Sequence, residues 1–310
     1  MKYRLAIRIR SWLQIKLLQY GFFLTIGKFR LSNVSKLISQ HENFLPESIA
    51  ILVQGPVIKR GNFTYKAISY YKRLYPKSRI ILSTWISEND EVLSMFRDLG
   101  IEIVLSKEVI NPGHMNINRQ IISTRAGLEI CNNVEYVLKT RTDVILRSPS
   151  FLEFLFAFYK EQCSLGRRGR IVITSFNTYF FRPYSFNDQL QFGSVVDLNK
   201  FWSCPLDERI QDNALAMRPV MEEWSKLELS EVWLVRNYLK SLDLNLPMSV
   251  EGSLIALREL FIVLDESVLS MYWLRSVLQD LQDRDRYAEL PFGPRVEQSD
   301  WMLMQLMGKQ

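Results

Sequence analysis

The chain has 310 residues, of which 47% are hydrophobic and 23% charged, and this ordinary composition excludes a disordered chain, a collagen-like chain and a small disulfide scaffold. Three widely spaced cysteines and only two histidines provide neither a disulfide framework nor a cysteine or histidine zinc site, so a reducing compartment such as the cytoplasm is expected. Any catalytic metal would need carboxylate ligands. The net charge of +6 favours anionic partners: phosphorylated substrates, nucleic acid or an anionic membrane face.

Residues 1–45 form a basic, apolar N-terminal arm. Residues 1–40 contain eight lysines and arginines and no acidic residue, so the rest of the chain is close to neutral, which argues against a nucleic-acid-binding groove. The apolar stretch between Lys16 and Lys28 is too short to span a bilayer. We expect residues 1–40 to lie as an amphipathic helix on the anionic inner face of the cytoplasmic membrane. A helix packed on the main domain, or a true spanning segment, is the alternative.

Residues 46–265 alternate apolar, β-branched runs with amphipathic stretches, a pattern typical of a mostly parallel sheet covered by helices. The expected strands are 48–57, 79–85, 101–105, 135–138, 170–174 and 186–196. The expected helices are 63–75, 88–99, 116–131, 151–159 and 220–239. We therefore predict one α/β catalytic domain with a Rossmann-like nucleotide-binding half. Residues 266–310, with a helix expected over 268–281, form a C-terminal helical extension.

In a parallel sheet, ligands bind at the carboxyl ends of the strands, and the first such end is Gln54-Gly55-Pro56. The glycine lets the backbone approach a ligand and the proline fixes the loop, although the same tripeptide is common in ordinary turns. The chain has neither a GxGxxG fingerprint nor a GxxxxGK[ST] loop, so nicotinamide and P-loop chemistry lose their best sequence support.

Lys139, Arg141 and Asp143 follow the fourth strand, and alternate residues of a strand share a face. Two cations and one carboxylate on one face suit a phosphate group and a divalent ion. The alternative is a structural ion pair at the end of a strand.

The helix over 116–131 and the segment after residue 185 carry two further groups of polar residues. The helix offers Asn118, Arg119 and Arg125 on its polar face, beside an N-terminus that suits anions. An ordinary solvated helix face is the alternative there. Asp188 lies among aromatic residues, where a carboxylate could act in catalysis or simply in a turn.

Five segments in this order resemble the WavE lipopolysaccharide synthesis family of bacterial glycosyltransferases. They are LVQGP at 52–56, STW at 83–85, NINRQIISTRAGL at 116–128, YVLKTRTD at 136–143 and NDQLQFG at 187–193. The resemblance runs from Ile49 to the helix near Glu231. It implies a GT-A-type fold that binds a nucleotide-diphospho-sugar, and an enzyme that transfers the sugar to a hydroxyl of a surface glycan, such as lipopolysaccharide core or capsule.

The resemblance also implies roles for individual residues. It places Gln54, Gly55 and Pro56 at the nucleoside; Arg119, Arg125, Lys139 and Arg141 near the diphosphate, with Asn118 also in the nucleotide-sugar site; Asp143 at a divalent metal, Mn²⁺ or Mg²⁺; Asp188 on the acceptor side or in the metal shell; and Glu231 on a helix bordering the site. For the base that takes the acceptor proton, Asp188 is our first expectation and Glu231 the second. One feature departs from the GT-A pattern, because Arg141 stands where the usual Asp-x-Asp signature has its first aspartate. Either a metal held by Asp143 or the cations Arg119, Lys139 and Arg141 could therefore neutralise the diphosphate.

Two other functions remain open at this point. A nucleotidyltransferase of sugar phosphates would share the Rossmann-like half, although Lys59-Arg60-Gly61 is only a faint version of its glycine-rich basic loop. A non-catalytic, membrane-associated glycan-binding protein would keep the basic arm without needing the cluster around Asp143.

Overall fold

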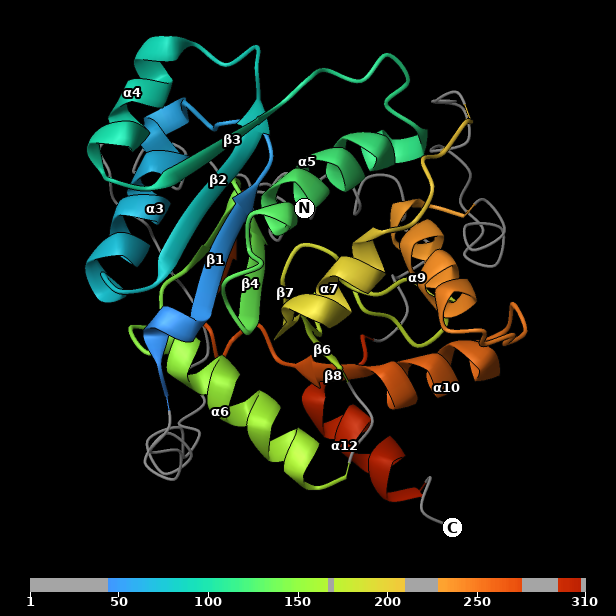
Figure 1. The fold of residues 1–310 in the computed structure, drawn as a ribbon. Coiled ribbons are helices and arrows are strands. Elements are labelled where there is room, and N and C mark those ends of the chain that lie inside the picture. The colour runs from blue at the N-terminus through green and yellow to red at the C-terminus, as the bar shows by residue number, and fades with distance from the viewer. Residues whose placement is uncertain (1–43, 167–169, 210–227, 275–294, 308–310) are drawn as a thin grey trace, which may run out of the picture.

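A computed structural model describes residues 44–166, 170–209, 228–274 and 295–307 (Figure 1). The arm over 1–43 lies outside the described residues. Seven strands form one sheet in the order β3-β2-β1-β4-β7-β6-β8. These strands are β1 (Ile49–Gln54), β2 (Arg79–Trp85), β3 (Glu102–Ser106), β4 (Tyr136–Arg141), β6 (Ile171–Thr174), β7 (Gln191–Ser194) and β8 (Phe261–Leu264).

The sheet is parallel from β3 to β4, and β7 runs antiparallel to both of its neighbours, β4 and β6. Strand β1 is buried along its whole length, as expected for a strand covered on both faces. The order reverses where β1 pairs with β2 on one side and β4 on the other. This reversal is the switch point at which α/β sheets bind ligands. The mostly parallel α/β sheet predicted from the sequence is confirmed.

Helices cover both faces of the sheet (Figure 1). They are α3 (Phe63–Leu74), α4 (Asp90–Asp98), α5 (Ile117–Glu129), α6 (Phe151–Ser164), α7 (Val195–Trp202), α9 (Ser230–Ser241), α10 (Val250–Leu260) and α12 (Gln298–Met307). Short 3₁₀ turns precede β1, α3 and α5: η1 (Pro46–Ser48), η2 (Arg60–Asn62) and η3 (His114–Asn116). Helix α5 packs closely on β1, because a Cβ on Gly127 would lie 2.3 Å from Leu52 Cδ1.

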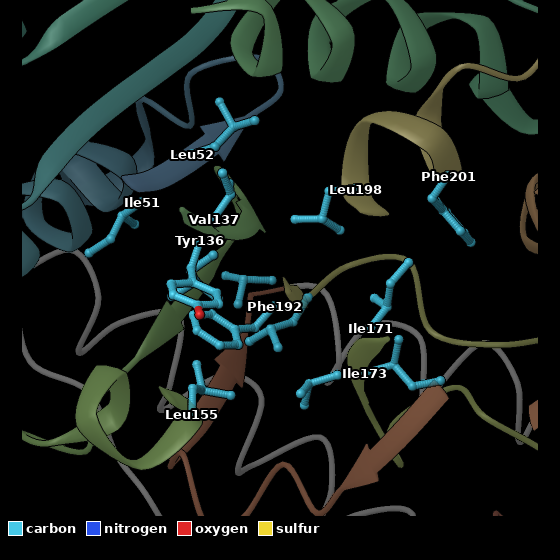
Figure 2. Close-up of a cluster of buried hydrophobic side chains, with 14 of the residues drawn as sticks. Ile51, Leu52, Tyr136, Val137, Leu155, Ile171, Ile173, Phe192, Leu198 and Phe201 are labelled. Carbon is cyan, nitrogen blue, oxygen red and sulfur yellow. The ribbon is translucent and has the colours of Figure 1, made fainter. Parts of the chain in front are cut away.

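The core between the sheet and α6 is aromatic. The Tyr136 ring of β4 stacks on Phe192 of β7 at 6.1 Å between ring centroids, and it meets Phe156 of α6 edge-on at 5.4 Å. Figure 2 shows Tyr136 and Phe192 side by side, with Leu155 of α6 close to them and Leu198 and Phe201 on another side of the cluster. Side chains of β4 therefore lie on both faces of the sheet: Tyr136 packs against α6, and Lys139 lies against Trp202 of α7.

The C-terminal half departs from the sequence prediction. The strand expected over 186–196 is only β7, because Val195 already begins α7. The helix expected over 268–281 is wrong at its start, because Met271–Trp273 form β9, which pairs antiparallel with β5 (Val144–Leu146) in a separate two-stranded sheet. Of the helix expected over 220–239, residues 230–239 are helical within α9, and 220–227 lie outside the described residues. The boundary between a catalytic domain ending at 265 and an extension over 266–310 stays a prediction.

Candidate functional site

A cavity of about 770 Å³ opens at the carboxyl ends of β1, β2 and β4, and this volume lies in the range of small-molecule sites. Segments at the end of β6 and the start of β7 complete its wall. Because β7 runs antiparallel, its first residues lie at the same edge of the sheet as the last residues of β4. The N-terminus of α9 closes the opposite side with Ser230 and Glu231. The cavity thus lies at the sheet edge where the sequence predicted a ligand.

The turn after β1 is rigid and close to β4. Gly55 has φ +124°, and a Cβ there would lie 2.9 Å from Thr142 Oγ1, so the position requires glycine. The buried Gln54 amide donates to Ser123 Oγ of α5 at 2.8 Å, and Thr142 N donates to Gln54 O at 3.0 Å. Gln54, Gly55 and Pro56 all line the cavity, and the turn can therefore present backbone to a ligand.

Asp143 is held by its neighbours through both carboxylate oxygens. Arg141 donates from Nε to Oδ1 at 2.9 Å and from Nη2 to Oδ2 at 3.0 Å, and Trp273 Nε1 of β9 also donates to Oδ2 at 3.0 Å. The Arg141 side chain is 22% exposed and that of Asp143 only 3%. Both residues line the cavity, with Arg141 the more open of the two to a ligand.

Lys139 lies behind the cavity wall and is not among the residues that line it. It is fully buried, with Nζ 2.5 Å from the carbonyl oxygen of Asp188 and 4.6 Å from the centre of the Trp202 ring. Burial lowers the pKa of its ammonium group to about 8, while the charge of Asp188 acts in the opposite direction. The predicted contact of Lys139 with a diphosphate stays a prediction; in this structure the cation holds the Asp188 segment.

Of the helix residues Asn118, Arg119 and Arg125, only Arg119 lies among the residues that line the cavity. Arg119 lines the cavity, with its guanidinium 3.9 Å from Glu108. Asn118 instead bonds the backbone of Asp207 through both ends of its amide at 2.7 Å. Arg125 donates to the carbonyls of Trp202 and Cys204. The donor-binding role expected of Asn118 and Arg125 is thus replaced by a structural one, because their polar atoms tie α5 to the segment after α7.

Asp188 and Glu231 both line the cavity. Asp188 is 5% exposed, and its Oδ2 is buried with no hydrogen-bond partner among the described residues. Glu231 lies in the first turn of α9, and Ser230 Oγ donates to its Oε2 at 3.0 Å. Burial, and next the charge of Asp188, raise the pKa of Glu231, whereas Arg182 lowers it. The two carboxylates are thus electrostatically linked, and a free carboxylate oxygen is available to accept a proton.

Several cavity residues were missed by the sequence analysis. They are Trp85 and Glu88 after β2, Asn177, Tyr179 and Arg182 after β6, and Trp273 on β9. The rule that strand ends carry ligand residues would have found those after β2 and β6, because both strands were predicted. Trp273 had no such signal, since its strand was expected to be helical.

The residues around Asp143 do not fit the divalent cation expected there. Across the described ranges, no group of three histidine, cysteine, aspartate or glutamate side chains could hold a metal. Both oxygens of Asp143 already accept hydrogen bonds, and the Arg141 guanidinium contacts both of them. A cation at this carboxylate would have to displace that arginine.

No described helix is both long and apolar enough to cross a membrane. The predicted membrane contact through residues 1–40 lies outside the described residues.

Solved structures that match this chain share little sequence identity with it and have low TM-scores. The synthase of 4-diphosphocytidyl-2C-methyl-D-erythritol from Anaerococcus prevotii is 12% identical with a TM-score of 0.39, covering 86% of this chain and 100% of its own. Glucosyl-3-phosphoglycerate synthase from Mycobacterium tuberculosis is 12% identical with a TM-score of 0.38, covering 68% and 85%. A cytidylyltransferase from Leptospira borgpetersenii is 13% identical with a TM-score of 0.33, covering 51% and 66%.

The mycobacterial enzyme has also been solved with Mn²⁺ and UDP-glucose, at 11% identity and a TM-score of 0.33; that match covers 56% of this chain and 64% of its own. At such low scores and identities, these likenesses support no conclusion about activity. No curated protein matches the chain.

The family comparison covers the part of the chain that builds the cavity. A family model described as WavE lipopolysaccharide synthesis matches residues 49–252. This range begins at the first residue of β1 and contains every predicted site residue, from Gln54 to Glu231. Because the match spans well over half of the sequence, the chain belongs to the WavE lipopolysaccharide synthesis family.

Proposed function

We propose that this protein is a glycosyltransferase that moves a sugar from a nucleotide-diphosphate donor to a hydroxyl of a surface glycan. The observation that carries the proposal is a cavity at the switch point that is lined both by guanidinium groups, those of Arg119 and Arg141 among them, and by carboxylates, including Asp188 and Glu231. The family's description, lipopolysaccharide synthesis, agrees with an acceptor of this class.

The donor would occupy the part of the cavity beside β1 and α5. The nucleoside would lie against Gln54, Gly55 and Pro56, where the rigid turn presents backbone. The diphosphate would lie between Arg119 and Arg141, both of which line the cavity. Negative charge grows on the departing diphosphate as the sugar leaves, and fixed cations beside that charge lower the barrier.

The acceptor would enter on the side of Asp188 and Glu231. A bond forms between the acceptor oxygen and the anomeric carbon, the bond from that carbon to the phosphate oxygen breaks, and the hydroxyl proton goes to a carboxylate. Asp188 is the first choice for this base because its Oδ2 has no partner among the described residues. Glu231, whose pKa is raised, is the second choice.

The geometry favours this function over the two alternatives. Lys59, Arg60 and Gly61 are not among the cavity-lining residues, and the Lys59 ammonium group is paired with Glu88 at 3.5 Å, so this faint basic loop lies beside the cavity and does not line it. A protein that only binds glycans has no use for a buried carboxylate without a partner, because burying such a charge costs free energy.

The first experiment is a thermal-shift panel of UDP-, GDP-, CMP- and dTDP-sugars, with and without Mn²⁺. A ligand that binds only the folded state raises the melting temperature by mass action, so stabilisation by one nucleotide class would identify the donor base. Incubation of that donor with a glycan acceptor then separates the functions. Glycosylated product supports the proposal. A nucleotidyltransferase would instead cleave the donor when pyrophosphate is added, giving a nucleoside triphosphate and a sugar phosphate, and stabilisation by no nucleotide at all would overturn both.

We further propose that the protein works at the cytoplasmic face of the inner membrane, with residues 1–40 as the contact. The support for this is the sequence alone: eight basic residues, many apolar ones and no acidic residue in that stretch.

A further inference from the structure

We infer that the cavity binds a nucleoside diphosphate without a divalent cation, because Arg141, held in place by Asp143, supplies the positive charge. This inference rests on the proposed function, since it concerns how the same donor is held. It assigns Asp143 a role different from that of a metal ligand: this carboxylate is a positioning residue for the arginine.

The first step is the difference in access between the two side chains. Asp143 is almost completely covered, at 3% exposure, whereas Arg141 is 22% exposed at the cavity wall. Trp273 also covers Asp143, because its indole nitrogen donates to Asp143 Oδ2. A ligand that enters the cavity therefore meets the guanidinium before it meets the carboxylate.

The second step is the direction of the guanidinium donors. Arg141 binds the carboxylate side-on, through Nε and Nη2. A guanidinium has five N–H donors in a fixed plane, so this pairing leaves Nη1 and one hydrogen of Nη2 for another acceptor. Nη1 makes no hydrogen bond to any described residue. The arginine is thus oriented on one edge and open on the other, which suits bidentate binding of a phosphate.

The third step is the surrounding charge. Arg119 provides a second guanidinium on the same cavity, 46% exposed and only loosely paired with Glu108 at 3.9 Å. A divalent ion bound to Asp143 would lie within a few ångströms of the Arg141 charge, and like charges at such distances repel strongly inside a protein. The donor set therefore favours arginine over metal at this position.

The test measures nucleotide affinity, a readout that does not depend on turnover. UDP, GDP, CDP and dTDP are titrated in turn into the full chain by calorimetry, once in EDTA and once in Mn²⁺. The expected result is one nucleotide whose Kd changes by less than about twofold between the two conditions, because the anion is held by hydrogen bonds from Arg141 rather than by metal.

Three variants sharpen the test. Arg141→Gln should weaken binding by roughly 10- to 100-fold in both buffers, the cost of losing charged hydrogen bonds. Asp143→Asn should weaken nucleotide binding less than Arg141→Gln does, and equally with and without Mn²⁺. The asparagine keeps only one of the two oxygens to which Arg141 donates. Arg141→Asp places a second carboxylate beside Asp143, so its residual binding should become dependent on Mn²⁺.

Arg97→Gln is the matched control, because Arg97 also pairs with an aspartate, Asp90, at 2.8 Å, but is not among the residues that line the cavity. Its nucleotide affinity should equal that of the parent protein. Melting temperatures identify any variant that fails to fold, and Asp143→Asn, which preserves side-chain size, keeps the test decisive if Arg141→Asp unfolds.

The outcomes separate this inference from the function on which it rests. Binding that occurs only with Mn²⁺, and is lost in Asp143→Asn, would overturn the inference while leaving a nucleotide-dependent transferase in place. Binding of no nucleotide in either buffer would overturn the proposed function, and the inference with it.

Discussion

Asp188 is the single side chain on which the proposed chemistry depends most. Asp188→Asn keeps the size of the side chain and removes its capacity to take a proton, so we expect transfer to fall by about 10²- to 10⁴-fold, the usual contribution of a general base. Product formation measured at saturating donor provides the value, and the nucleotide thermal shift should remain. Near-parental turnover in a folded Asp188→Asn protein would exclude this residue as the base.

Glu231 gives the protein a pH dependence of stability with a definite sign. Its folded-state pKa is raised above the ordinary 4.5, chiefly by burial and then by the charge of Asp188. A raised carboxyl pKa favours folding while the group is protonated, and this contribution is lost as the pH rises from 4.5 through the folded-state pKa. Denaturant unfolding of the parent and of Glu231→Gln, compared from pH 4 upward, should show the parent losing stability relative to the variant. A constant difference would contradict the raised pKa.

The location of the site could be predicted from the ends of strands, but the surroundings of each side chain depend on tertiary partners. Gln54 and Arg141 lie at the cavity, where the switch-point rule places them, whereas Lys139 of the same strand as Arg141 is fully buried. Arg125 had the same polar character in the sequence, yet its partners are backbone carbonyls of 202 and 204. Nothing in a helix's own sequence tells which of its arginines meets a ligand and which meets a distant loop.

At the scale of elements, β9 links the C-terminal part of the chain to the site through Trp273. Trp273→Phe keeps the edge-on contact with Phe176 at 5.4 Å and removes the hydrogen bond to Asp143. We expect a loss of about 1 kcal/mol in the free energy of unfolding, together with weaker nucleotide binding, because Asp143, the partner of Arg141, is held less firmly. Denaturant melts and calorimetry measure the two effects.

Trp233→Phe is the control for that experiment. Its indole nitrogen donates to Pro205 O at 3.1 Å, and Trp233 is not among the cavity-lining residues. The control should lose stability without losing nucleotide affinity. Equal affinities for the two variants would mean that β9 has no part in holding the donor.

The close packing of α5 on β1 gives a second prediction at this scale. Gly127→Ala places a Cβ 2.3 Å from Leu52 Cδ1, so we expect a loss of about 1–3 kcal/mol from overpacking. Leu52→Ala in the same chain removes the clashing atoms, and the double variant should lose less than the sum of the single variants. Additive losses in denaturant melts would show that the strand, rather than this side chain, limits the approach.

Helices and strands with a clear hydrophobic periodicity could be predicted from the sequence. Those whose ends carry no glycine, proline or other turn residue could not. The strand over 79–85 was predicted at its true bounds because RIILSTW is a β-branched run between a turn and an acidic helix start. In contrast, α10 passes directly into β8 at Phe261, with no glycine or proline between them. The segment LIALRELFIVL, apolar except for Arg258 and Glu259, carries no local signal for the change from helix to strand, and β5, with three residues, is too short to show a period.

At the scale of the whole molecule, the uneven distribution of charge makes a prediction about membranes. The protein has a net charge of +6, but the eight basic residues of the arm exceed that excess, so the body without the arm carries a slight acidic excess. Juxtamembrane basic residues contribute about 1 kcal/mol each on an anionic surface. We therefore expect the full chain to sediment with phosphatidylglycerol vesicles, and a chain lacking residues 1–40 to stay in solution.

Two comparisons separate electrostatic attraction from apolar insertion in that experiment. Raising the salt concentration shortens the Debye length and weakens only the charge attraction, so a bound fraction that falls with salt identifies the basic residues as the contact. Changing Arg4, Arg8 and Arg10 to Gln leaves the apolar residues of the arm in place and should reproduce much of the deletion. If the shortened chain binds the vesicles as well as the full chain does, the membrane contact lies on the body, and the basic arm serves another purpose.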